Sequence, residues 1–100
     1  MVERKIKKIF EKYGWYVVRA GGSLGKADLV CVKNGRCILI QVKSTKKKYI
    51  YYNEYMKDKF LGFYFYVVVD FAYRGAIITK PKKKITIDDG KKLEEFLKEN

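Results

Sequence analysis

Three polar side chains at the ends of two neighbouring β-rich runs are of the types that metal-dependent hydrolysis needs. They are Asp28, Gln41 and Lys43, in the pattern D–x12–Q–x–K. A carboxylate and an amide oxygen, together with the carbonyl of Val42, supply oxygen ligands to a hard divalent cation such as Mg²⁺. A lysine beside that cation orients an attacking water or stabilises charge that develops on a scissile phosphate. Glu3 adds a further carboxylate if the first helix packs across the end of the sheet.

A predicted β-hairpin brings these residues together. Asn34-Gly35 lies between two runs rich in β-branched residues, and Asn-Gly is the strongest short-range signal for a two-residue hairpin turn. In that register Asp28 lies directly opposite Gln41. Because successive side chains alternate between the two faces of a strand, Asp28, Gln41 and Lys43 project to the same side. Both faces are otherwise mostly apolar, which predicts central strands that are covered on both sides.

Each of these residues also has a purely structural interpretation. Asp28 starts a strand or caps the turn after a glycine-rich segment, since Asp favours turns. Gln41 and Lys43 are then polar residues at the end of a strand, and Glu3 balances the helix dipole from the first turn. Ser23 is most simply a turn residue.

The rest of the pattern predicts one α/β domain over residues 1–100, with a central mixed β-sheet flanked by helices. Apolar spacing predicts an amphipathic helix over 2–13, strands over 15–19, 27–33, 36–43, 63–71 and 76–79, a short edge strand over 85–87, and helices over 53–61 and 91–99. We expect a basic loop over 44–50, and Asp88 or Asp89 as the N-cap of the last helix.

The charge of the chain points to a polyanionic partner. Lys and Arg number 23 against 11 Asp and Glu, which gives a formal net charge of +12. Nucleic acid is the commonest polyanion in a cell, and membrane surfaces and acidic proteins are rival partners. The chain contains no His, which excludes His-ligated zinc, a His general base and a Ser-His or Cys-His nucleophile.

The cysteines and the N-terminus indicate the compartment. Cys31 and Cys37 fall on opposite faces of the predicted hairpin, so we expect reduced thiols rather than a disulfide. The first residues carry no apolar segment of a signal peptide, and no stretch reaches the length of a membrane span. We therefore expect a cytoplasmic, intracellular protein, associated with the nucleoid and with no membrane partner.

Five short motifs follow one another along the first half of the chain. They are Glu3-Arg4, Gly14-Trp15-Tyr16-Val17-Val18-Arg19, Gly22-Ser23, Asp28-Leu29-Val30 and Gln41-Val42-Lys43. In this order and spacing, residues 2–45 resemble the archaeal Holliday-junction resolvases of the PD-(D/E)xK nuclease superfamily. The resemblance implies a restriction-endonuclease-like core, with strands beyond residue 45 that match in outline.

The resemblance also implies roles for individual residues. It implies a metal and catalytic cluster made of Glu3, Asp28, Gln41 and Lys43, with Ser23 in contact with the substrate or the site. It implies that Arg4, Arg19 and Lys26 hold DNA phosphates. On charge alone, we add the run Lys46, Lys47 and Lys48 to the candidate DNA-binding residues. The tyrosines at 49, 51, 52 and 55 beside this run either stack on bases or pack in the core or at an interface.

One position departs from the family pattern in a way that bears on activity. Where the family has its second acidic residue, this chain has Gln41, so the four-residue cluster carries a charge of −1 instead of −2. A lower ligand charge weakens metal binding. Three explanations compete: an active Gln-x-Lys site, as in Mrr-type restriction endonucleases, a naturally inactive DNA binder, or a deliberate replacement of Glu. A second departure, a short middle helix where the family has part of its dimer surface, leaves the mode of assembly open.

The resemblance predicts a Mg²⁺-dependent endonuclease, with Mn²⁺ as a substitute, that resolves four-way junctions in branched DNA. Two matched cuts require two identical sites, which a two-fold homodimer supplies. The alternatives are a nuclease of the same fold that cuts duplex or flapped DNA, and a catalytically silent DNA-binding module. The sequence fits an archaeal or a viral source.

Overall fold

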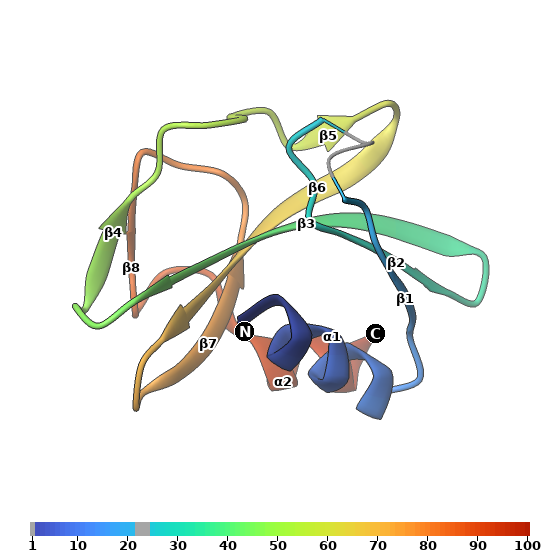
Figure 1. The fold of residues 1–100 in the computed structure, drawn as a ribbon, viewed down its shortest axis with the longest axis horizontal. Coiled ribbons are helices and arrows are strands. Elements are labelled where there is room, and N and C mark those ends of the chain that lie inside the picture. The colour runs from blue at the N-terminus through green and yellow to red at the C-terminus, as the bar shows by residue number, and fades with distance from the viewer. Residues whose placement is uncertain (1, 22–24) are drawn as a thin grey trace.

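The computed structural model describes residues 2–21 and 25–100 and shows a mixed β-sheet with both helices on one face (Figure 1). In chain order the elements are α1 (Val2–Lys12), β1 (Tyr16–Arg19), β2 (Leu29–Lys33), β3 (Arg36–Thr45), β4 (Tyr49–Tyr51), β5 (Lys59–Phe60), β6 (Phe63–Phe71), β7 (Gly75–Thr79), β8 (Lys84–Thr86), β9 (Lys91–Lys92) and α2 (Leu93–Glu99). No helix in these described ranges is long and apolar enough to cross a membrane.

The main sheet has the strand order β1-β2-β3-β6-β7-β9, with β5 paired to β6. Only the central β3–β6 pair is parallel, and the other pairs in this sheet are antiparallel. The predicted hairpin is confirmed: Lys33 pairs with Arg36 and Val30 with Leu39. Asn34 and Gly35 have φ values of 50° and 78°, as a turn with two left-handed residues requires.

The central strands are covered on both faces, as their apolar pattern predicts. On one face, Ile38, Ile40 and Val42 of β3 pack in a core to which α1 and α2 contribute Ile6, Phe10, Leu93 and Leu97. On the other face, Leu39 and alternate residues of β6 pack against Tyr52 and Ile85. Cys31 lies in the first core, Cys37 borders the second, and both are free thiols as expected.

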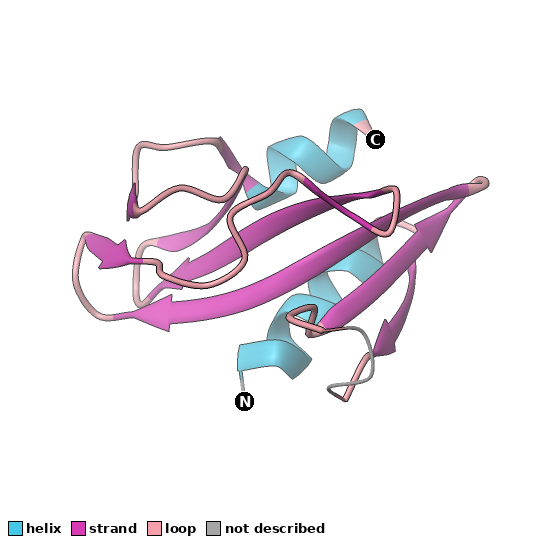
Figure 2. Cartoon of the chain, turned by 90° about the horizontal axis from the view of Figure 1, so that it is seen from above, coloured by secondary structure: helices cyan, strands magenta, loops and turns pink. Residues whose placement is uncertain are grey.

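The predicted helix over 53–61 is wrong. The chain between β4 and β5 runs without helix across the face of the sheet opposite α1 and α2, as Figure 2 shows from that side. Tyr52 is buried, and Tyr55 packs edge-on against Phe60 and Phe65 with ring centroids 5.4 and 4.9 Å apart. An extended path lets these aromatic residues reach one sheet face, whereas a helix of this length directs part of them away from it.

Two further boundaries differ from the prediction. The expected basic loop over 44–50 is mostly strand, because β3 continues to Thr45 and β4 pairs with β8 in a separate two-stranded sheet. The last helix begins after Lys92, which is its N-cap, so neither Asp88 nor Asp89 caps it. Asp89 instead accepts hydrogen bonds from the Thr86 amide at 2.7 Å and the Lys82 ammonium at 2.9 Å, which close the turn before β9.

Gly90 in this turn tolerates no side chain. It has a φ of +61°, and a Cβ at this position lies 2.2 Å from the Ile78 carbonyl oxygen. We expect Gly90→Ala to lower the free energy of unfolding by about 3 kcal/mol, the sum of a left-handed alanine and a backbone clash. Gly35→Ala is the control, since Gly35 also has a positive φ but open space around it. Urea denaturation of both variants tests this, and equal losses contradict it.

Candidate active site

The predicted polar residues of the hairpin meet where β2 begins, on the face opposite α1. Gln41 and Lys43 both lie on β3, and Asp28 lies directly before β2. Asp28 extends the hairpin beyond its last paired strand residue: its amide donates to the Ile40 carbonyl at 2.8 Å, and its Oδ2 accepts from the Val42 amide at 2.8 Å. The carboxylate is therefore fixed beside the strand that carries Gln41.

A residue that the sequence did not indicate joins this cluster from the segment between β4 and β5. Glu54 Oε1 accepts a hydrogen bond from Gln41 Nε2 at 2.8 Å, and Glu54 Oε2 accepts one from Lys43 Nζ. Gln41 is 5% exposed, so its amide is a buried polar group that needs partners. Glu54 accepts a hydrogen bond from the nitrogen of that amide and is also the counter-ion of Lys43.

Tyr52 provides the partner for the other end of the amide. Its hydroxyl lies 2.7 Å from Gln41 Oε1 and 2.9 Å from the Tyr55 carbonyl oxygen, so one hydroxyl proton serves two acceptors. With the tyrosine on its oxygen and Glu54 on its nitrogen, the Gln41 amide has one satisfied orientation. A glutamate in this position faces the Glu54 carboxylate directly, without the amide N–H that now joins the two side chains.

The charges of the cluster act on one another. The hydrogen bond from Lys43 holds the pKa of Glu54 below its ordinary value, with the Gln41 hydrogen bond acting in the same direction against burial. Burial raises the pKa of Asp28, and the charges of Glu3 and Glu54 raise it further, whereas the Val42 amide and the Lys43 charge lower it. Glu54 therefore stays ionised, and Asp28 lies within the field of both other carboxylates.

Glu3 lies at the margin of this cluster. Its Oε1 is 3.5 Å from Arg19 Nη2 in an ion pair between α1 and β1, and its charge contributes to the raised pKa of Asp28. Lys26 also lies close, because its charge lowers the pKa of Glu54. Ser23 falls outside the described residues.

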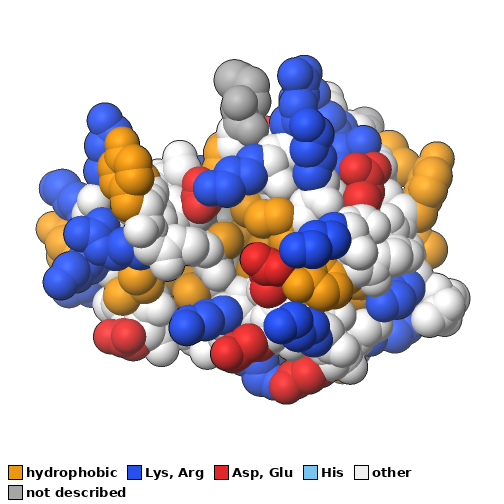
Figure 3. All heavy atoms as spheres, turned by 90° about the horizontal axis from the view of Figure 1, so that it is seen from below, with side chains coloured by type: hydrophobic (Ala, Val, Ile, Leu, Met, Phe, Trp, Pro, Cys, Tyr) orange, Lys and Arg blue, Asp and Glu red, His pale blue; other side chains and the backbone are white. Residues whose placement is uncertain are grey.

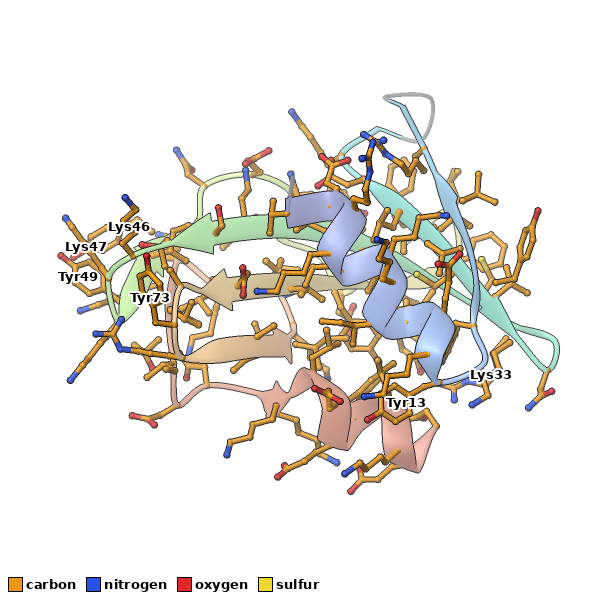
Figure 4. All side chains as sticks on the ribbon, turned by 60° about the horizontal axis from the view of Figure 1, so that its bottom comes forward. Tyr13, Lys33, Lys46, Lys47, Tyr49 and Tyr73 are labelled. Carbon is orange, nitrogen blue, oxygen red and sulfur yellow. The ribbon has the colours of Figure 1, made fainter. Side chains whose placement is uncertain are left out.

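The other candidate DNA-binding residues lie apart from the cluster. Arg4 is exposed on α1, where it borders a shallow hollow with Lys5 and Lys8. Lys46 and Lys47 lie with Tyr49 and Tyr73 at one end of the molecule, away from Tyr13 and Lys33 (Figure 4). The turn that holds them, residues 46–48, is exposed throughout.

The tyrosines of this region differ in their surroundings. Tyr52 and Tyr55 belong to the core face. Tyr49 and Tyr51 instead form an edge-on pair on β4, and Lys84 lies 4.9 and 5.8 Å from their ring centroids. The β4–β8 sheet therefore presents aromatic rings and ammonium groups together, which is the combination that binds nucleic-acid strands.

The face that carries α1 and α2 has acidic as well as basic side chains, unlike the 46–48 turn. Figure 3 shows acidic side chains scattered among its lysines and arginines. Ion pairs join Lys5 to Asp70, Lys7 to Glu11 and Lys12 to Glu94. Part of the positive charge on this face is thus neutralised within the protein, whereas the exposed 46–48 turn consists of lysine alone.

The cluster offers oxygen atoms to a cation. Asp28 and Glu54 contribute carboxylates, and Gln41 contributes an amide oxygen with two lone pairs, one of which accepts from Tyr52. A set of oxygens that includes carboxylates suits Mg²⁺ or Mn²⁺. Within residues 2–21 and 25–100, no three His, Cys, Asp or Glu side chains gather as a metal site. The cluster instead combines carboxylate oxygens with one amide oxygen.

Glu54 and Tyr52 are the site residues that the sequence did not reveal. Glu54 stands 13 residues after Gln41 in a segment that the spacing assigned to a helix, and no motif surrounds it. Its position follows from the path of the chain across the sheet face. The sequence left Tyr52 with the same two interpretations, base stacking or packing, as Tyr49, Tyr51 and Tyr55. Its burial distinguishes it from the exposed Tyr51.

Comparison with known proteins gives one family. A model of the archaeal Holliday junction resolvase (Hjc) family matches residues 1–99. The crossover junction endodeoxyribonuclease Hjc of Methanocaldococcus jannaschii is 33% identical over 61 residues, which are 61% of this chain and 45% of that protein, so the match spans less than half of this relative. The solved structure of Hjc from Archaeoglobus fulgidus, a Holliday junction resolvase from an archaeal hyperthermophile, aligns with a TM-score of 0.70 at 19% identity, over 97% of this chain and 93% of that one. This likeness confirms the expected α/β nuclease-like fold.

The hydroxyl of Tyr52 is expected to stabilise the cluster. Tyr52→Phe leaves the buried Gln41 oxygen without its donor and should lower the free energy of unfolding by about 1 kcal/mol. Tyr51→Phe is the matched control, because Tyr51 is 70% exposed, and its effect should stay within about 0.5 kcal/mol. Chemical denaturation of both variants measures the difference. If the two substitutions have the same effect, the hydroxyl does not support Gln41.

Proposed function

The chain belongs to the archaeal Holliday junction resolvase (Hjc) family, and we propose that it is a structure-selective DNA endonuclease that cuts four-way junctions. The observation that carries this proposal is the family match over residues 1–99, together with the common position of Asp28, Gln41 and Lys43 on one face of the sheet. Its substrate lies with the chromosome, so we place its action inside the cell, at the nucleoid.

The proposed reaction is hydrolysis of a phosphodiester. A bound Mg²⁺, or Mn²⁺ in its place, supplies the activation of water and the polarisation of the scissile phosphate. The oxygens of Asp28, Gln41 and Val42 are the proposed ligands, and Glu3 approaches from α1. Lys43 presents its ammonium group to the phosphate, where it stabilises the charge that develops during the reaction.

Binding of the junction rests on the excess of positive charge. We propose that Arg4, Arg19 and Lys26 hold DNA phosphates and that Ser23 contacts the substrate or the site. The exposed turn of Lys46, Lys47 and Lys48 is a second candidate contact at the end of the sheet. Such contacts release counterions, so the affinity should fall as the salt concentration rises.

Two matched cuts require two sites, and we propose that a homodimer provides them. Tyr16, Val18 and Val32 are 71%, 46% and 37% exposed and lie side by side on β1 and β2. By alternation along the strands, they share the sheet face of Asp28, and this face is uncovered there. A second copy packed on it buries the apolar side chains and relates the two sites by two-fold symmetry.

Gln41 favours a second candidate function, a DNA-binding module of the same fold without catalysis. A neutral amide contributes less to metal binding than a carboxylate does. This module binds branched DNA tightly and in a salt-sensitive manner, but yields no product with Mg²⁺ or Mn²⁺.

The assignment of Asp28 leads to a test of cleavage. The chain should nick a labelled four-way junction symmetrically in Mg²⁺ or Mn²⁺ and leave the matching linear duplex intact. Asp28→Asn removes a metal-holding charge and should lower the rate by about 100-fold or more. Because phosphate contacts carry most of the affinity, junction binding should persist.

The control for this test is Asp88→Asn, an exposed position outside the cluster. An Asp28→Asn protein that cuts as fast as the control refutes the assignment. Equal cutting of junction and duplex indicates the duplex nuclease, and binding without cutting indicates the silent module.

The proposed dimer surface leads to a test of assembly. Val18→Asp places a charge in the buried interface and should raise the dimer dissociation constant by at least about tenfold, as sedimentation measures it. Leu61→Asp is the control, because Leu61 is an exposed apolar residue that lies away from β1 and β2, directly after β5. A chain that binds junctions specifically while monomeric at micromolar concentration contradicts the two-fold arrangement.

A further inference from the structure

We infer that Glu54 is the second carboxylate of the proposed metal site and that the Gln41 amide holds it in place. This inference rests on the proposed function, since it concerns the same site. It assigns a role to a residue that lies outside the linear motif, on a different segment of the chain. It also gives Gln41 a task that a carboxylate does not perform.

The contacts of Glu54 place its carboxylate over β3. Oε1 accepts from Gln41 Nε2 at 2.8 Å, and Oε2 accepts from Lys43 Nζ. Both donors belong to the strand that carries the linear motif, and both point to the face on which the Asp28 carboxylate lies. Each carboxylate oxygen has two lone pairs, so each keeps one that these donors do not use.

The segment around Glu54 is anchored on both sides. Tyr52, two residues before it, is 2% exposed and bonded to Gln41. Tyr55, the next residue, packs between Phe60 and Phe65. A carboxylate between two packed tyrosines loses little conformational freedom when it binds a cation, which is the condition for an effective ligand.

The charge of the cluster supports a role in cation binding. Glu3, Asp28, Gln41 and Lys43 together carry −1, and Glu54 brings the total to −2. Glu54 lies over the same face of β3 as Asp28, and after burial and the charge of Glu3 its negative charge adds to the repulsion that raises the pKa of Asp28. A divalent cation relieves this repulsion, and the affinity for it rises with the charge of the ligands.

A counter-ion role for Lys43 is the competing explanation. The side chains of Lys43 and Glu54 are 30% and 31% exposed, and an ion pair with that exposure contributes at most about 1 kcal/mol. The Lys43 side chain is exposed enough for water to solvate its charge without a counter-ion. The hydrogen bond from Gln41 Nε2 also fixes the other oxygen of Glu54, which an ion pair with Lys43 alone does not hold.

The test measures Mn²⁺ binding to the DNA-free protein from the paramagnetic resonance signal of free Mn²⁺. Glu54→Gln keeps an oxygen that accepts from Gln41 and removes only the charge, so binding should weaken by at least about tenfold. The double variant Gln41→Glu with Glu54→Gln returns the carboxylate to the cluster and should recover most of the affinity. Glu95→Gln, at an exposed position on α2, should bind as the unchanged chain does.

The outcomes separate this inference from the proposed function. If Glu54→Gln binds Mn²⁺ as tightly as the unchanged chain, or if the double variant fails to recover binding, the inference is overturned. Asp28→Asn serves as the reference: it should lose Mn²⁺ binding. If Asp28→Asn loses binding while Glu54→Gln keeps it, only the role of Glu54 fails. If both keep it, the metal site of the proposed function fails as well.

A second measurement covers the case in which Glu54→Gln does not fold. In the unchanged chain, substoichiometric Mn²⁺ should broaden the nuclear magnetic resonance signals of the Gln41 side-chain amide and the Glu54 backbone amide. The Glu95 backbone amide on α2 should stay sharp. Broadening that spares Gln41 and Glu54 overturns the inference without any substitution.

Discussion

The parallel pairing of β3 with β6 is the constraint on which the rest of the structure depends. Parallel neighbours cannot be joined by a hairpin, so the chain between them must cross one face of the sheet. The two helices cover one face, and the crossing segment, residues 46–62, covers the other. A segment of the chain outside the motif is thereby placed over the part of β3 that carries Gln41 and Lys43.

This crossing also satisfies the buried polar groups that the site requires. Gln41 lies at 5% exposure in the middle of an apolar sheet, where an unpaired amide costs about 1–3 kcal/mol. The crossing segment supplies Tyr52 for the amide oxygen and Glu54 for the amide nitrogen. The contacts that satisfy the buried Gln41 amide therefore also bring a group of oxygen atoms together beside Asp28.

The parts of this arrangement that local sequence determines were predictable, and the parts that long-range pairing determines were not. Asn34-Gly35 sets the hairpin register, and alternation then places Asp28, Gln41 and Lys43 together. The apolar run of β6 was predicted with its bounds, Phe63–Phe71. Neither the hairpin turn nor the apolar run of β6 indicates that β3 and β6 pair in parallel. The sequence therefore did not determine the path of residues 46–62.

The wrong predictions follow from the lack of information on how distant segments pair. The sequence suggested a helix over 53–61, and this prediction concealed the approach of Glu54 to Gln41 and Lys43. The cap predicted at Asp88 or Asp89 failed for a similar reason, since Asp89 bonds to the chain before it and not to the helix after it. The motif on one hairpin indicates the family and brings Asp28, Gln41 and Lys43 together, whereas the position of Glu54 depends on a distant segment.

The most direct measurement is the anomalous diffraction of Mn²⁺ in crystals of the unchanged chain. We expect a single strong peak beside β3, within a coordination distance of about 2.2 Å of oxygens from both Asp28 and Glu54. A peak bound by Asp28 with Glu54 still paired only to Lys43 contradicts the shared site, and a peak away from both residues contradicts the assignment of the active site.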